Sequence, residues 1–263
     1  MSQSFTKLTS NHWVVQSELY FTNSGVFLND NQACLIDPGI FPQEIKKIKA
    51  SVGEKQAEPQ SLVITHSHWD HVVGHGIFPG APLYTSAVLA RSIREGGGLA
   101  AEAVAKAREY DSRWYVERPW GYAWPADVRG IDDGGWFNIG DLDIEAFLVP
   151  GHAPDCLAAR VEGCLLVGDY LSPCEIPFVD DLADPDCYDR ILQEAEDAGV
   201  DVSTADGDDP RTNGETYRED IRESEQRDFD RLFIELLDRE NITVVVKGGP
   251  AINDALREDA EVK

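Results

Sequence analysis

Positively charged side chains are few in this 263-residue sequence, which has 23 Lys and Arg against 48 Asp and Glu, and almost all of the acidic excess lies in the second half. Residues 132–263 contain 35 acidic and 11 basic residues, residues 1–131 contain 13 and 12, and the formal net charge is −25. A surface this acidic cannot neutralise many phosphates, so we expect neither nucleic acid nor an anionic membrane as a partner. Salt adaptation would acidify both halves, so it explains the asymmetry only in part, and a local role of the charge stays open.

Paired cysteines and long apolar runs are also missing. The five cysteines are an odd number without a Cys-x-x-Cys spacing, which favours reduced thiols in a chain of this size. They are Cys34, Cys156, Cys164, Cys174 and Cys187. No stretch approaches the roughly 20 apolar residues of a membrane span, and residues 1–9 lack the apolar segment of a signal peptide. We therefore expect a cytoplasmic protein.

Hydrophobic patterns predict strands in two groups, each followed by helices. The predicted strands are Trp13–Tyr20, Gly25–Leu28, Ala33–Ile36, Ser61–Thr65, Leu142–Val149, Cys156–Val161, Cys164–Val167 and Val200–Thr204. The predicted helices are Pro42–Val52, Asp186–Ala198 and Thr216–Glu240, and the apolar run at 242–247 fits a strand or a helix. The short connections of the first strands indicate an antiparallel meander. Two packed sheets with helices outside follow from this order.

Residues 86–135 do not have the pattern of a sheet. Two helices are predicted here, Ala87–Glu95 and Leu99–Tyr115, and an aromatic stretch follows that includes Trp114, Trp120 and Trp124. In one interpretation the aromatic rings pack the helices onto the body of the protein. In the other they belong to a lid, or to an arm of a homodimer, and wall an apolar pocket for a small-molecule substrate.

Four of the six histidines lie within ten residues, in the stretch Thr-His-Ser-His-Trp-Asp-His-Val-Val-Gly-His at 65–75. Neutral imidazole is the commonest ligand of transition metals. His66 and His68 follow a predicted strand two residues apart, so they can bind one ion from the same side. Asp70 and His71 then offer an oxygen and a nitrogen to a second ion. The cluster therefore predicts a metal site.

The spacing His-x-His-x-Asp-His at 66–71 resembles the signature of the metallo-β-lactamase superfamily of metal-dependent hydrolases. Two further elements occur in the family's order, namely His152 in Pro-Gly-His and Asp169 in Gly-Asp, each after a predicted strand. Asp37 in Ile-Asp-Pro-Gly matches an element that supports the metal loop. The last element differs, because Ala-Asp206-Gly stands where the family has Pro-Gly-His-Gly. The resemblance covers about residues 12–210.

The resemblance implies a fold of the α+β class. This fold is a four-layer αββα sandwich of two mixed β-sheets with helices outside. We expect residues 1–263 to form one such domain. It would include the aromatic lid or insertion at about 86–135 and a helical C-terminal extension at about 212–263.

The resemblance also assigns the metal ligands. Those of the first metal are His66, His68 and His152, those of the second are Asp70 and His71, and Asp169 bridges the two. Asp206 is our candidate for the last ligand because a carboxylate oxygen also binds zinc. In the alternative Asp206 is a turn residue before Gly207, and Asp208 and Asp209 are nearby substitutes for the ligand. A shorter, charged ligand would weaken the second site, favour iron or manganese there, or leave it empty.

The implied activity is hydrolysis of a small-molecule ester, lactone, thioester or amide by water that two zinc ions activate, with iron or manganese as alternatives. The predicted catalytic residues are Asp70 and Asp169, and the predicted pocket residues are Tyr170, Trp114, Trp120 and Trp124. The acidic second half favours a neutral or cationic substrate over an anionic glutathione thioester. Two alternatives stay open: a mononuclear iron enzyme that resembles the sulfur dioxygenases, and a catalytically weak metal-binding relative.

Overall fold

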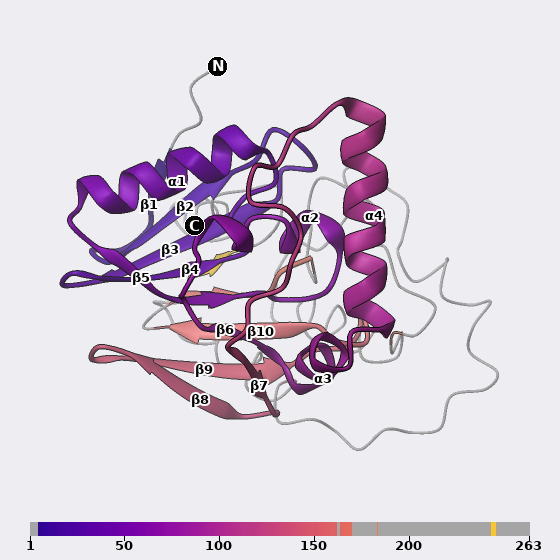
Figure 1. Ribbon diagram of the computed structural model, residues 1–263. Coiled ribbons are helices and arrows are strands. Elements are labelled where there is room, and N and C mark those ends of the chain that lie inside the picture. Colours follow the sequence, from indigo (N-terminus) through magenta and orange to yellow (C-terminus); the bar gives the residue numbers. More distant parts are fainter. Residues whose placement is uncertain (1–4, 162–163, 170–182, 184–242, 246–263) are drawn as a thin grey trace, which may run out of the picture.

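Two β-sheets pack face to face, and helices cover the outer face of the larger sheet (Figure 1). The computed structural model describes residues 5–161, 164–169, 183 and 243–245. Within these ranges one sheet has seven strands and the other has five. The two mixed sheets with outer helices agree with the architecture expected from the strand order.

The seven-stranded sheet changes from antiparallel to parallel pairing at its fourth strand. In spatial order its strands are β1 (Phe5–Lys7), β2 (His12–Gln16), β3 (Asn23–Asn29), β4 (Gln32–Ile36), β5 (Glu58–Val63), β6 (Leu83–Ser86) and β7 (Val128–Ile131). Strands β2 to β4 form the predicted antiparallel meander, and β1, which was not predicted, pairs antiparallel with β2. Strands β4 to β7 run parallel, so each of these pairs needs a crossover connection.

Helices provide these crossovers. They are α1 (Pro42–Glu54), then α2 (Trp69–Val72) with the 3₁₀ helix η1 (His75–Ile77), and then α3 (Ala87–Glu95) with α4 (Gly98–Trp114). Helix α1 has proline in its first turn and buries Ile45, Ile48 and Val52 on one face. Helix α3 begins where the Ser86 hydroxyl accepts a hydrogen bond from the amide of Leu89.

The five-stranded sheet is built mainly from hairpins. Its spatial order is β12 (Thr243–Val245), β11 (Cys164–Leu166), β10 (Leu157–Val161), β9 (Leu142–Leu148) and β8 (Gly135–Ile139). Strands β8 to β11 pair antiparallel, whereas β12 pairs parallel with β11. The apolar run at 242–247 therefore contains a strand that extends this sheet.

Two apolar layers hold the elements together. Between the sheets, residues of β3 and β4 such as Phe27 and Ile36 pack against Ile144 and Leu166 of the smaller sheet. On the outer face of the larger sheet, its other side chains contact the buried faces of α1, α3 and α4. The alternation of side chains along each strand explains why one strand serves both layers.

The segment at 86–135 contains the two expected helices and also strand β7, which was not expected. Its sequence, Val-Arg-Gly-Ile, lacks the alternation that indicates a half-buried strand. Strand β7 is recognised only by its parallel pairing with β6, at the edge of the described sheet. The expectation of no sheet structure in this segment was therefore wrong for these four residues.

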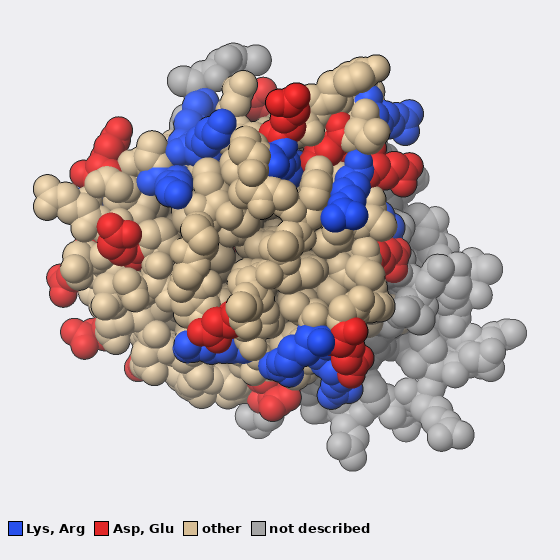
Figure 2. Space-filling model, in the orientation of Figure 1, with Lys and Arg blue, Asp and Glu red and all other residues tan. Residues whose placement is uncertain are grey.

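Several predictions fall outside the described residues. These are the helices at 186–198 and 216–240, the strand at 200–204 and most of the extension at 212–263. The extent of the domain and of its insertion stays a prediction. Among the described residues, no helix is both long and apolar enough to cross a membrane. On the face seen in Figure 2, acidic and basic side chains lie near one another around the margin, and the centre is mostly uncharged.

Candidate metal centre

Side chains with metal-binding atoms converge beyond the carboxyl ends of β5, β9 and β11. The segment after β5 supplies His66, His68, Asp70 and His71, the loop after β9 supplies His152, and the turn after β11 supplies Asp169. The structure thus brings together the six described residues that the resemblance assigned as ligands. Asp206 and Tyr170 lie outside the described residues.

The first group consists of His66, His68, His152 and Asp169, whose ligand atoms all lie within 4.8 Å of one another. Nε2 of His152 is 2.9 Å from Nδ1 of His68 and 4.0 Å from Oδ2 of Asp169. Two imidazole lone pairs at this distance repel unless a proton or a cation lies between them. The first group therefore has the spacing and the chemistry of a site for one cation.

The second group consists of Asp70, His71 and Asp169, and its ligand atoms meet the same 4.8 Å limit. Nε2 of His71 is 3.0 Å from Oδ1 of Asp169 and 3.6 Å from Oδ2 of Asp70. Asp169 belongs to both groups and presents a different oxygen to each. This geometry suits a carboxylate that bridges two ions, and two-metal hydrolytic sites have such an arrangement.

Burial and protonation agree with metal binding by the histidines. Nε2 of His66 is buried and has no hydrogen-bond partner among the described residues, which a metal ion would supply. Burial, followed by the neighbouring histidines, lowers the pKa of His66 well below its usual value. Burial also lowers the pKa of His68 to about 4. Both rings are therefore neutral near pH 7, the form that binds metals.

His71 lies in a different electrostatic environment. Burial alone would lower its pKa, but the carboxylates of Asp169, Asp37 and Asp70 together raise that pKa well above its usual value. A cation is therefore favoured between these carboxylates, and a bound metal ion would take the place of the proton.

Asp37 supports the second group through His71, at the ring nitrogen that does not face Asp169. Its Oδ2 lies 2.8 Å from Nδ1 of His71 and accepts a 2.7 Å hydrogen bond from the hydroxyl of Thr65, while its Oδ1 accepts a 2.9 Å hydrogen bond from the amide of Thr65. A proton on Nδ1 of His71 leaves Nε2 for the metal. Asp37 has a left-handed backbone with φ of 45°, and its carbonyl accepts a hydrogen bond from Ser24. The role of Asp37 expected from the resemblance thus has a geometric basis.

Two further contacts join the ligand segments to one another. The hydroxyl of Ser67 donates a 3.1 Å hydrogen bond to Asp155, so the segment of His66 and His68 is tied to the loop of His152. Gly168 has φ of 59°, and a Cβ there would lie 2.9 Å from the Thr65 hydroxyl. Only glycine fits this close approach without strain. Sequence reasoning assigned no role to Asp155, because its partner is 88 residues away.

An aromatic cluster forms around Trp69, a residue of the ligand segment, and differs partly from the predicted one. Trp69 is between His68 and Asp70 in sequence, stacks on Tyr110 at 4.2 Å between ring centroids, and meets Tyr20 edge-on at 6.4 Å. Trp114 is 6.4 Å from Tyr110 and is 59% exposed.

Two of the predicted pocket tryptophans donate hydrogen bonds to backbone carbonyls. The indole of Trp120 donates to the carbonyl of Val73, and that of Trp124 donates to the carbonyl of Ala100 and stacks on His75. Their role as substrate contacts stays a prediction. The sequence signal for Trp69 was its position within the ligand motif.

Comparisons with known proteins agree with the fold and the site. The family described as the Metallo-beta-lactamase superfamily matches residues 18–234. The chain is 29% identical over 138 residues to Glyoxylase B2 of Dictyostelium discoideum, which covers 49% of this chain and 41% of that protein. It is 28% identical over 171 residues to a probable metallo-hydrolase of Bacillus subtilis, with 60% and 67% covered.

A similar solved structure is the metallo-beta-lactamase from Pontibacter korlensis. Its sequence identity is 18%, its TM-score is 0.54, and the alignment covers 74% of this chain and 86% of that one. The predicted fold is therefore confirmed. The matched region spans less than half the length of the Dictyostelium relative.

Proposed function

The chain belongs to the metallo-beta-lactamase superfamily, and from this premise we propose that it hydrolyses a small-molecule ester, lactone, thioester or amide in a metal-dependent reaction. The observation that carries the proposal is the pair of ligand groups that share Asp169. One group is rich in imidazole nitrogen and the other in carboxylate oxygen, a combination that suits zinc first, and iron or manganese as alternatives.

In the proposed reaction the metal ions, their ligands and Asp70 have different roles. When bound, the metals supply Lewis acidity and lower the pKa of water towards about 7. His66, His68 and His152 would hold one ion, and Asp70 and His71 the other, with Asp169 between them. Asp70 is proposed to orient the attacking water, and the hydroxyl of Thr22, 3.5 Å from its Oδ2, helps to fix that carboxylate. No covalent nucleophile of the protein is needed.

The aromatic cluster of Tyr20, Trp69, Tyr110 and Trp114 supports a substrate with a planar or apolar group. Trp69 lies between the ligands His68 and Asp70 in the sequence, which links the cluster to the ligand segment. Aromatic rings favour stacked or edge-on partners and contribute apolar contact area. We propose that this cluster contacts the acyl or leaving group. A neutral or cationic substrate is preferred over an anionic one because of the excess of acidic residues in the second half of the chain.

Purified protein is expected to contain zinc, iron or manganese and to hydrolyse members of a panel of esters, lactones and thioesters. Aryl esters should have lower KM values than alkyl esters of the same acid because they can stack on the aromatic cluster. Dialysis against a chelator should abolish the activity, and added Zn²⁺ should restore it. Full activity in metal-free protein would contradict the proposal, and metal binding without any hydrolysis would indicate the catalytically weak relative instead.

Asp206→Ala is expected to lower the metal content from about two ions per chain towards one. The reason is that the carboxylate of Asp206 is proposed as the last ligand of the second metal, in place of the usual histidine. Metal content is measured by mass spectrometry after gel filtration, with Asp141→Ala as the control, because Asp141 is exposed and belongs to neither ligand group. An unchanged count would rule out Asp206 as a ligand. One iron per chain together with oxygen uptake on a persulfide would point to the sulfur dioxygenase alternative.

A further inference from the structure

A buried ion pair joins Asp111 of α4 to Arg118, in the segment that follows α4. Nε of Arg118 is 2.5 Å from Oδ2 of Asp111, and its terminal Nη2 donates a 3.0 Å hydrogen bond to Oδ1. The side chains of Arg118 and Asp111 are 0% and 2% exposed. The hydroxyl of Tyr122 donates a third hydrogen bond to Asp111, at 2.7 Å. We refer to Asp111 and Arg118 as the clasp.

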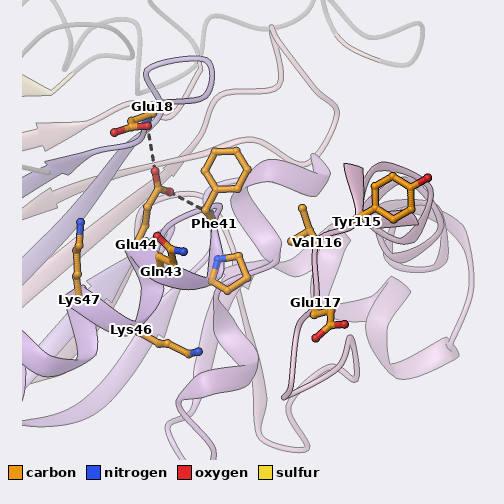
Figure 3. A pocket seen from close by; sticks show the side chains of 10 residues that line it. Glu18, Phe41, Gln43, Glu44, Lys46, Lys47, Tyr115, Val116 and Glu117 are labelled. Carbon is orange, nitrogen blue, oxygen red and sulfur yellow. Dashed lines mark hydrogen bonds between the residues drawn. The ribbon is translucent and has the colours of Figure 1, made fainter. Parts of the chain in front are cut away.

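The clasp also binds the backbone of the loop between β4 and α1. The remaining terminal nitrogen of Arg118, Nη1, donates a 2.6 Å hydrogen bond to the carbonyl of Ile40. The amide of Ile40 donates a hydrogen bond to Oε2 of Glu44. Figure 3 shows that Glu44 also accepts hydrogen bonds from the amides of Phe41 and Glu18. Ile40 is therefore held at its carbonyl by the clasp and at its amide by α1.

The loop held in this way contains Asp37, three residues before Ile40. Two of its residues have a left-handed backbone, with φ of 45° at Asp37 and 84° at Gly39. A non-glycine residue in this conformation persists only where surrounding contacts enforce it. Asp37 orients His71 and accepts a hydrogen bond from the amide of Thr65. A shift of the loop would therefore disturb both contacts with the ligand segment.

The energetics of buried ion pairs suggest that stability is not the main role of the clasp. The desolvation of two charges offsets most of their attraction, and an apolar pair of similar volume often supports the same stability. An apolar pair could not donate a hydrogen bond to Ile40, however. Arginine can satisfy a carboxylate and a carbonyl at once because its donors form a planar fork.

We propose that Arg118, fixed by Asp111, is a positioning residue that holds the loop at 37–41 so that Asp37 keeps His71 oriented for the metal. This role rests on the proposed function only through the identity of His71 as a ligand. A cavity of about 590 Å³ opens beside the clasp, lined by residues adjacent to its partners, including Phe41 and Glu117 (Figure 3). In this proposal the insertion that carries α4 acts as a support of the metal centre.

The test separates positioning from stability by a pair of variants. Arg118→Met alone leaves Asp111 buried without its partner, so the melting temperature should fall. In the double variant Asp111→Leu/Arg118→Met no charge is left unpaired, and most of that fall should be recovered. The affinity of the double variant for its more weakly bound Zn²⁺ should nevertheless stay about 10–100-fold below that of the unmodified protein. Removal of the supporting partners of metal ligands has effects in this range. Recovery of both properties in the double variant would overturn the proposal.

A second readout does not depend on metal. In metal-free protein, exchange of the Thr65 amide, which donates to Asp37, should be at least about 10-fold faster in the double variant, while amides in α1 keep their protection. Unchanged exchange at Thr65 would also overturn the proposal. If exchange at Thr65 is faster in the double variant but the unmodified protein binds no Zn²⁺, the positioning role of Arg118 is supported and the proposed hydrolase is contradicted. Arg129→Met is the matched control, because the ion pair of Arg129 with Asp127 is exposed, and neither readout should change.

Discussion

Replacing His68 with alanine is expected to lower kcat/KM for ester hydrolysis by at least about 10³-fold without unfolding the protein. His68 contributes a ligand atom to the first group, and its removal should cost the several kcal/mol that a metal supplies to the transition state, at 1.36 kcal/mol for each factor of ten. The side chain is only partly buried, so its truncation leaves a small defect in packing. Steady-state kinetics, metal content and the melting temperature of the metal-free protein measure the three effects separately.

His75→Gln is the matched control for this variant. His75 belongs to the same histidine-rich stretch, but it is absent from both ligand groups, and its ring contacts the carbonyls of Val72 and Ala123 and stacks on Trp124. The control can lose stability but should retain its metal, and its kcat/KM should stay within a few-fold of the original. Full activity in His68→Ala, or loss of metal in His75→Gln, would contradict the assignment of the site.

Gly74→Ala is expected to destabilise the protein by about 3 kcal/mol or more, a large share of the stability of a typical domain. A Cβ at this position would lie 2.2 Å from the carbonyl oxygen of Pro38 and 3.1 Å from that of Gly39. Both atoms belong to the backbone of the loop that carries Asp37, so no side-chain rotation relieves the overlap. Urea unfolding should show a lower midpoint, and metal affinity should fall as well because Asp37 is displaced from His71.

Gly53→Ala provides the matched control for this glycine. Gly53 lies in α1, is exposed, and a Cβ there would meet nothing within 4 Å. Alanine should therefore raise the free energy of unfolding by roughly 0.5–1 kcal/mol, as helix propensity predicts. If both variants had the unfolding midpoint of the original protein, the close contact between Gly74 and Pro38 would not exist in solution.

Much of the fold could be predicted because its elements have strong local patterns. Helix α1 has a proline at its start and an apolar stripe, and β9 alternates between buried and exposed side chains over most of its length. Strands β1, β6, β7 and β8 were not predicted. Strand β6 has only four residues, and β7 lacks alternation. Such short strands form because a neighbouring strand is already in place, and this pairing partner is not visible in the local sequence.

Part of the candidate site could likewise be predicted from the sequence, and part could not. The six described ligands could be named from motifs because a metal requires particular atoms at short spacings after rigid strands, as at His66, His68 and Asp70. Neither the contact of Ser67 with Asp155 nor that of Arg118 with Ile40 could be named, since each joins residues more than 75 positions apart. The aromatic neighbours of Trp69 were likewise hidden, because Tyr20 and Tyr110 come from distant segments.

The sequence by itself determined the kinds of atoms available for chemistry, the excess of negative charge in the second half and the strands that precede the ligands. Only the tertiary structure decided which segments meet: His152 and Asp169 approach the histidine cluster because β9, β10 and β11 pack over the larger sheet. It also decided that Asp37 contacts His71 and that Arg118 contacts Ile40, in the loop that carries Asp37. The physical reason is that metal coordination is fixed within a few ångströms, and such distances between remote segments follow from core packing rather than from any local pattern.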